Sequence, residues 1–127
     1  MLIVPDTNFL VYLTKYKLWH ELERIYGRYT LLVLPQVAYE LRELGKKTKA
    51  TGEDKEAASL ALEFIKKMNV KPEKGHADAV LVQIAQWLAD VKEEFIIGTM
   101  DKELIQKLKK HKAKILMIRQ KTHLTEN

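Results

Sequence analysis

Four acidic residues lie far apart in the chain, yet their side chains could act together: Asp6, Glu40, Asp78 and Asp101. Each can be placed near an end of a predicted strand or helix, where an open parallel sheet gathers its ligands. Carboxylates held within a few ångströms of one another repel strongly unless they are protonated or bind a metal. Hard oxygen ligands suit Mg²⁺ or Mn²⁺, and such ions can activate a water for phosphodiester hydrolysis. The four residues therefore predict a metal-dependent hydrolytic site.

Asp6 also has a structural interpretation. It follows an apolar run and precedes Thr7 and Asn8. All three residue types are favoured where a helix begins, because a side-chain oxygen can accept an unpaired backbone N–H. Taken alone, Asp6 is better explained as a helix cap, and only the other three acids favour a site. Within that site we expect Asp6 and Asp101 to be the first candidates for direct metal ligands, and Asp78 to be the next. We expect Glu40 to act through water.

The apolar pattern predicts an alternation of strands and helices. Runs of strand length cover 2–5, 30–34, 69–72, 95–98 and 114–118, and helical patterns lie between them. This order is typical of a parallel α/β sheet with right-handed crossovers. It places Asp6 and Asp101 after strands, Asp78 in the first turn of a helix, and Glu40 one to two turns into another. The clearest amphipathic helix, expected to pack on the core, carries Ala57, Leu60, Ala61, Phe64, Ile65 and Met68.

Length and composition limit the class of protein. The 127 residues fit one domain, 1–127, without internal repeat or low-complexity tract. The chain has no cysteine, which excludes a disulfide framework and a thiol nucleophile and fits a reducing compartment. We find no secretion signal and no apolar run long enough for a membrane span, so we expect a cytoplasmic protein without a membrane partner. A net charge of +5 and a pI near 9.3 permit a nucleic-acid partner.

Two groups of lysines could contact a polyanion: Lys46, Lys47 and Lys49, and Lys107, Lys109 and Lys110. The first group has an alternative explanation as a solvated loop. The second is partly explained by the preference of cations for a helix carboxyl terminus. Trp19 and Trp87 lie beside helical apolar stripes, so we expect them to pack at the core or its boundary. His76 follows Gly75 in a turn, where we expect it to be exposed.

The order and spacing of the acidic motifs resemble those of the PIN-domain ribonucleases, from Leu2 to about Arg119. The likeness rests on Asp6-Thr7-Asn8 after an apolar run, Glu40 on a helix after the second strand, Asp78 opening a helix between two alanines, and Thr99-Met100-Asp101 after a strand. The resemblance implies a five-stranded parallel sheet sandwiched by helices. It also implies Mg²⁺- or Mn²⁺-dependent cleavage of single-stranded RNA.

By the same resemblance, Asp6, Glu40, Asp78 and Asp101 form the acidic metal-binding set. Thr7 or Asn8 would support it, and Thr99 would supply a hydroxyl near the site. Met100 departs from the small polar residue that is common in the family, so this chain has no polar side chain at that position.

Several alternatives stay open. Within the family, short members are toxins of toxin–antitoxin pairs, which implies an antitoxin partner, while others process pre-ribosomal RNA; the tail from Met117 to Leu124 favours the second group. A homodimer is expected by analogy. A relative that binds RNA as a scaffold without turnover would carry the same acids. A phosphorelay receiver domain would need a phospho-accepting aspartate directly after a middle strand, and Asp54 follows a polar loop instead. A dinucleotide-binding domain would need a glycine-rich turn where Asp6-Thr7-Asn8 stands.

Overall fold

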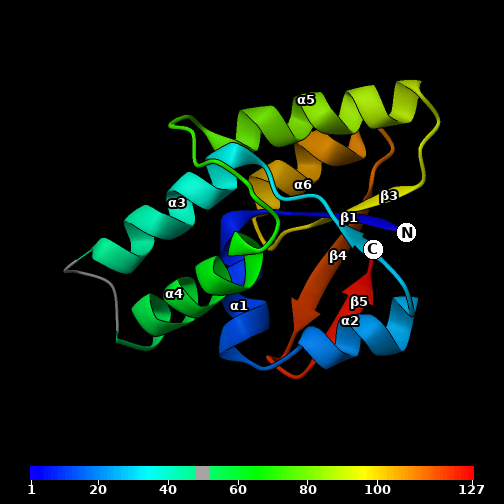
Figure 1. The fold of residues 1–127 in the computed structure, drawn as a ribbon. Helices are drawn as coiled ribbons and strands as arrows, with labels where there is room; N and C mark the ends of the chain where they lie inside the picture. Colours follow the sequence, from blue (N-terminus) through cyan, green and yellow to red (C-terminus); the bar gives the residue numbers. More distant parts are fainter. Residues whose placement is uncertain (48–51) are drawn as a thin grey trace.

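The computed structural model describes residues 1–47 and 52–127. The fold alternates strands with helices along most of its length (Figure 1). The elements are, in chain order, β1 Leu2–Pro5, α1 Thr7–Lys15, α2 Trp19–Tyr26, β2 Thr30–Leu31, α3 Pro35–Lys46, α4 Gly52–Lys66, α5 Ala77–Asp90, β3 Phe95–Gly98, α6 Lys102–Lys109, β4 Lys114–Arg119 and β5 His123–Glu126.

The five strands form one sheet in the order β2-β1-β3-β4-β5. β1 pairs in parallel with both β2 and β3, and β3 pairs in parallel with β4. After β1 the chain forms β2 at one edge of β1, and it later forms β3 at the other edge of β1. The strand order therefore reverses between β1 and β3. The carboxyl ends of two strands at such a point form the crevice where α/β sheets bind ligands. Asp6 follows β1 directly, and Thr99 follows β3.

The sheet differs from the predicted one at three places. Residues 69–72 form no strand, because Pro72 has no N–H for a ladder and the preceding Asn69 has a left-handed backbone, with φ of 54°. The second strand ends at Leu31 rather than at residue 34. The fifth strand is instead β5, which pairs antiparallel with β4. Its tight connection places Gln120 and Lys121 at positive φ, so the sheet is mostly, but not wholly, parallel.

Helices cover both faces of the sheet, as predicted. α5 and α6 contact each other, and α6 contacts β4; Figure 1 shows them together on one side of the sheet. α1 contacts β4 and α2 contacts β5 from the opposite side. α3 and α4 pack on each other and on α1, beside the carboxyl ends of β1 and β3. The single-layer sheet between two helical layers is the expected sandwich.

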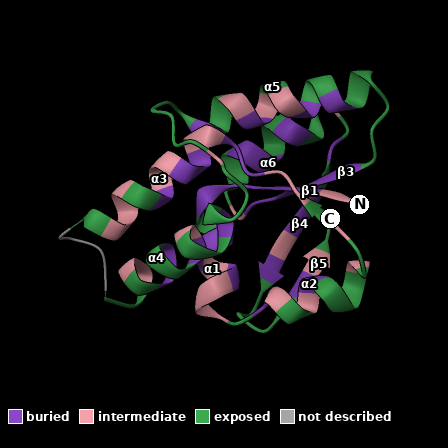
Figure 2. Cartoon of the chain, in the orientation of Figure 1, coloured by how far each residue is buried: buried purple, intermediate pink, exposed green. Residues whose placement is uncertain are grey.

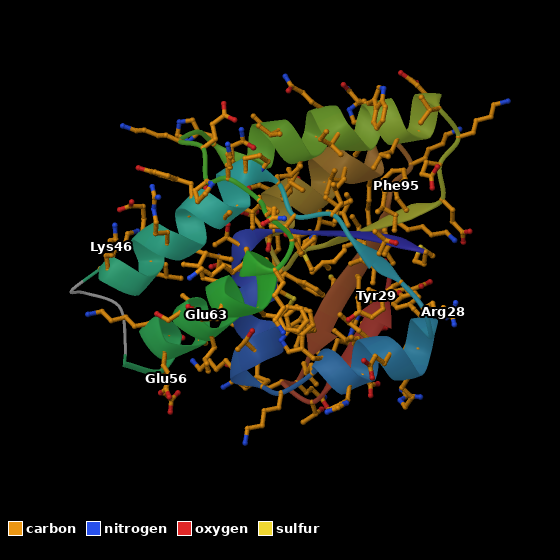
Figure 3. The ribbon with its side chains drawn as sticks, in the orientation of Figure 1. Arg28, Tyr29, Lys46, Glu56, Glu63 and Phe95 are labelled. Atoms are coloured by element: carbon orange, nitrogen blue, oxygen red, sulfur yellow. The ribbon has the colours of Figure 1, made fainter. Side chains whose placement is uncertain are left out.

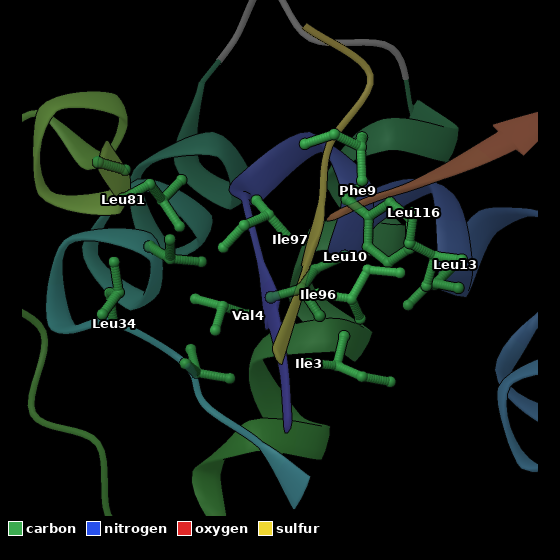
Figure 4. Packing of buried hydrophobic residues seen from close by; sticks show 14 of the residues in the cluster. Ile3, Val4, Phe9, Leu10, Leu13, Leu34, Leu81, Ile96, Ile97 and Leu116 are labelled. Carbon is green, nitrogen blue, oxygen red and sulfur yellow. The ribbon is translucent and has the colours of Figure 1, made fainter. Parts of the chain in front are cut away.

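The core is built from strands that are buried on both faces (Figure 2). Val4 and Ile97 point toward the side of Leu81 in Figure 4. Ile3 and Ile96 point to the opposite side, and all four strand residues are fully buried. This explains why β1 and β3 read as continuous apolar runs rather than as alternating ones.

The apolar stripe of α4 is only half covered, contrary to the prediction. Ala57, Ala61 and Ile65 are buried, but Leu60 and Phe64 are 55% and 47% exposed, and Met68, in the turn after the helix, is 40% exposed. The neighbouring helices α1 and α3 cover only the alanine side of the stripe. The Trp19 ring stacks on Phe64 with centroids 4.2 Å apart, a boundary position as expected.

Trp87 on α5 is 58% exposed, so the expectation that it packs at the core or its boundary was wrong. Asp54 lies in the first turn of α4, 2.9 Å from the Lys15 ammonium, and does not follow a strand as a receiver aspartate would. No helix among the described residues is both long and apolar enough to cross a membrane.

Candidate active site

Asp6 occupies the junction between β1 and α1 and is only 6% exposed. It is the N-cap of α1, and its Oδ1 accepts a hydrogen bond from the Phe9 N–H at 2.7 Å. Its Oδ2 accepts a hydrogen bond from the Thr99 hydroxyl. The Asp6 N–H continues the β1–β3 ladder by donating to the Gly98 carbonyl at 2.8 Å. The capping interpretation of Asp6 is therefore part of the structure, and it places the carboxylate at the sheet edge.

The junction between β3 and α6 repeats this arrangement. Thr99 is fully buried, and its hydroxyl accepts from the Asp101 N–H at 3.1 Å while it donates to Asp6. Asp101 is the N-cap of α6, and its Oδ1 accepts from the N–H groups of Glu103 and Leu104 at 2.9 and 3.1 Å. Thr99 thus links the two capping aspartates through one buried hydroxyl.

The other two acids come from helices that reach the same edge. Glu40 lies on α3 and accepts a hydrogen bond from the Thr7 hydroxyl through its Oε1. Asp78 lies in the first turn of α5. Together with Asp6 and Asp101, these side chains line one open cavity of about 750 Å³, to which Asn8, His76 and Lys107 also contribute. The structure therefore brings all four predicted carboxylates to one cavity.

The carboxylates are close enough to affect one another electrostatically. The pKa of Asp6 is raised to about 6, mainly by burial and to a smaller extent by the charges of Asp78 and Asp101, while the hydrogen bonds from Thr99 and Phe9 oppose the shift. The pKa of Asp78 is also raised, first by burial and then by Asp101 and Glu40, while Lys107 opposes the shift. The cavity thus stores repulsion between negative charges at neutral pH.

The donor set has the chemistry of a divalent-cation site. Carboxylate oxygens are the ligands that Mg²⁺ and Mn²⁺ prefer, and a cation would relieve the repulsion that raises both pKa values. Across residues 1–47 and 52–127, however, no group of three or more Asp, Glu or His side chains is already arranged to hold one ion. Both Asp6 oxygens and one oxygen each of Asp101 and Glu40 already accept hydrogen bonds. The residues fit such an ion by chemistry and location, and their side chains would have to converge on it.

The predicted lysines divide between different places. Lys107 lines the acidic cavity, whereas Lys109 ends α6 and Lys110 is its C-cap. Lys47 lines a neighbouring cavity. Lys46 is the last residue of α3, and Figure 3 shows it at the end of that helix away from the sheet. Lys49, also predicted to contact RNA, lies outside the described residues.

Three other features bear on the sequence predictions. His76 is exposed as expected, but it also lines the acidic cavity, and its position two residues before Asp78 was the available signal. The Met100 sulfur accepts a hydrogen bond from the Ile118 N–H at 3.0 Å, so this side chain is directed to β4. A Cβ added to Gly98 would lie 2.6 Å from Cδ1 of Phe9, so only glycine fits beside this ring. Phe9 is also the residue whose backbone N–H donates to the capping Asp6. Sequence reasoning assigned Gly98 no such role.

Comparison with known proteins agrees with this geometry. A family model described as a PIN like domain matches residues 3–121. Ribonuclease VapC4 of Methanocaldococcus jannaschii is 34% identical over 125 residues, which cover 95% of this chain and 92% of that protein. Both matches extend over nearly the whole chain and confirm the resemblance found in the acidic motifs. The chain belongs to the PIN-like domain family.

Proposed function

We propose that the chain is a divalent-metal-dependent endoribonuclease that hydrolyses phosphodiester bonds in single-stranded RNA. The observation that carries this proposal is the cavity lined by Asp6, Glu40, Asp78 and Asp101 at the carboxyl ends of β1 and β3. The name of the relative, Ribonuclease VapC4, supports RNA as the substrate class. The surplus of 22 Lys and Arg over 17 Asp and Glu suits a polyanionic substrate.

The polar side chains in and beside the cavity divide into metal ligands, supports for those ligands and a phosphate contact. Asp6, Asp78 and Asp101 would hold Mg²⁺ or Mn²⁺, with Glu40 acting through water, and the ion would supply water activation and charge neutralisation at the phosphate. Thr99 holds the Asp6 carboxylate through its hydroxyl, and Thr7 holds Glu40 in the same way. Lys107 adds a positive charge to the acidic cavity, where it can contact a phosphate oxygen. Asn8 lines the rim as a neutral polar group.

The biological setting has two candidates. The similarity to Ribonuclease VapC4, which extends over nearly the whole of both chains, favours the setting of the short members, a toxin whose partner is an antitoxin protein. Processing of ribosomal RNA precursors rests only on the tail from Met117 to Leu124, which forms the end of β4, the turn and the start of β5. We therefore propose the toxin setting first. This reverses the preference drawn from the tail.

The test is cleavage of an unstructured circular RNA, which only an endonuclease can open. We expect cleavage with Mg²⁺ or Mn²⁺ and none in EDTA. Asp78→Asn should lower the rate by at least ~100-fold, because removing a metal ligand costs at least as much as removing an outer partner. Asp90→Asn, at the exposed far end of the same helix α5, is the matched control and should cleave normally. Undiminished cleavage in EDTA or by Asp78→Asn would contradict the mechanism, and RNA binding without cleavage would leave the scaffold alternative.

A further inference from the structure

A second cavity of about 440 Å³ adjoins the acidic one. Thr7, Asn8, Glu40 and His76 line both, so the two cavities meet at these residues, and we refer to them together as the groove. A linear polymer with its reacting bond at the four carboxylates must leave the acidic cavity along such a groove. The second cavity is therefore positioned to receive the part of the substrate next to the reacting phosphate.

The character of the side chains changes along this groove. Beyond the shared residues, the second cavity is lined by Tyr39, Lys47 and Lys74, with Glu43 and the shared Glu40 as opposing charges. The Arg42 guanidinium lies 5.4 Å from the centroid of the Tyr39 ring and 3.8 Å from the Glu43 carboxylate, so it balances that charge beside the aromatic surface. An aromatic ring among cations is the combination that proteins use to hold a single-stranded nucleotide, with the base stacked and the phosphate neutralised.

The segments that carry these groups are fixed to one another. Tyr39 lies on α3, and Lys74 lies on the connection that precedes α5. The Glu73 N–H donates to the Pro35 carbonyl at 3.0 Å, which ties this connection to the first turn of α3. A Cβ on Gly75 would lie 3.0 Å from Cγ of Gln36, so the glycine allows the connection to approach the helix closely. The connection that carries Lys74 is thus fixed against the helix that carries Tyr39.

We propose that this second cavity is a nucleotide subsite, in which Tyr39 stacks on the base next to the reacting phosphate while Lys47 and Lys74 bind the adjoining phosphates. The inference rests on the proposed ribonuclease function and adds to it the residues that hold a flanking nucleotide. Stacking is tolerant of base identity because every base has a π-face. The subsite therefore selects single-stranded RNA over paired RNA without reading sequence.

The experiment measures binding of a labelled single-stranded RNA in EDTA, where the proposed cleavage does not occur. Tyr39→Leu should weaken binding by about ten-fold, within the range that base stacking contributes, while Tyr39→Phe should bind like the unmodified protein. Tyr29→Leu is the matched control, since Tyr29 precedes β2, which places it at the amino-terminal edge of the sheet, and lines a different cavity (Figure 3). Lys74→Ala should weaken binding more than Lys71→Ala, which lies in the same connection.

A second arm tests the stacking itself. After the cleavage site is mapped with Mn²⁺, RNAs are made with a single abasic nucleotide on either side of it. One of the two should bind the unmodified protein about ten-fold more weakly, and should bind Tyr39→Leu no more weakly than intact RNA does. If the abasic nucleotide and Tyr39→Leu each lower the affinity and their effects multiply, the proposed subsite is wrong. It is also wrong if Tyr39→Leu binds RNA as well as Tyr29→Leu does while the unmodified protein still cleaves RNA. An unmodified chain that neither binds nor cleaves RNA would overturn the proposed function and the subsite together.

Discussion

Replacing Asp6 by asparagine removes one charge from the acidic cavity and keeps the capping oxygen. The Oδ1 that accepts from the Phe9 N–H has a direct counterpart in asparagine, which is as good a helix cap as aspartate. The other oxygen, which accepts from the Thr99 hydroxyl, becomes an NH₂ group. Thr99 already accepts from the Asp101 N–H, so its own hydroxyl proton loses its acceptor. The substitution therefore separates the effect of charge from that of one hydrogen bond.

The two effects have opposite signs and different pH dependence. Because burial raises the Asp6 pKa from 3.8 to about 6, the folded state binds the proton more tightly than the unfolded state does. The associated stability is present below about pH 4 and is lost as the pH rises through 6, by about 3 kcal/mol in total. Loss of the Thr99 hydrogen bond costs about 1 kcal/mol at every pH. In the absence of metal, the variant should be less stable than the unmodified protein at pH 4 and more stable by about 2 kcal/mol at pH 7.5.

Thermal unfolding in EDTA at fixed ionic strength between pH 4 and pH 7.5 measures this crossover. At pH 7.5 the variant should unfold at a temperature higher by roughly 5–10 °C. Excess Mg²⁺ should stabilise the unmodified protein more than the variant, because the ion binds the folded site. Asp90→Asn serves as the control for loss of a distant charge. A variant that is less stable at both pH values, and that gains as much from Mg²⁺ as the unmodified protein, would leave Asp6 as a structural cap.

Two further substitutions test the supports of the site. Gly98→Ala should lower the free energy of unfolding by about 1–3 kcal/mol, because its Cβ meets the buried Phe9 ring. Urea unfolding of the single variants Gly98→Ala and Phe9→Leu and of the double variant should show that the two losses are coupled. Strictly additive losses would contradict the contact. Asp101→Ala should cost about 1 kcal/mol by uncapping α6, whereas Asp101→Asn should keep stability and lose RNA cleavage. If Asp101→Asn cleaves RNA as fast as the unmodified protein, Asp101 acts only as a helix cap.

Much of the fold could be predicted because its central strands are buried on both faces. The runs before Asp6 and before Thr99 are continuously apolar, and they become β1 and β3. The fifth strand was not predicted, since β5 buries only Leu124 among its four residues and depends on pairing with β4. The apolar stripe on α4 shows a second limit of prediction from sequence. Periodicity indicates which face of a helix is apolar, but the positions of the neighbouring helices decide how much of that face is covered.

The acidic set could also be predicted, because Asp6, Asp78 and Asp101 each stand at the start of a helix, where a local pattern marks them. Glu40 lies further along α3. The groups that hold these acids could not be predicted. Thr7 is paired with Glu40, and Thr99 with Asp6, across separations of 33 and 93 residues. The fit of Gly98 against Phe9 depends on the crossing of a strand end and a helix start. Such contacts follow from the relative position of three segments, which no local pattern encodes.

Three helix starts offset part of the repulsion between the four carboxylates. Asp6 and Asp101 are N-caps of α1 and α6, and Asp78 lies in the first turn of α5. The partial positive charge at each helix start stabilises a carboxylate by about 0.3–1 kcal/mol, which offsets part of the mutual repulsion. The capping bonds of Asp6 and Asp101 direct one oxygen of each carboxylate toward backbone N–H groups. Glu40 has no helix start to hold it and is held by Thr7 instead. A cation bound here would therefore share these carboxylates with the backbone N–H groups of the caps. An ion that keeps several of its own waters needs only a few protein ligands, so it could bind without breaking the caps.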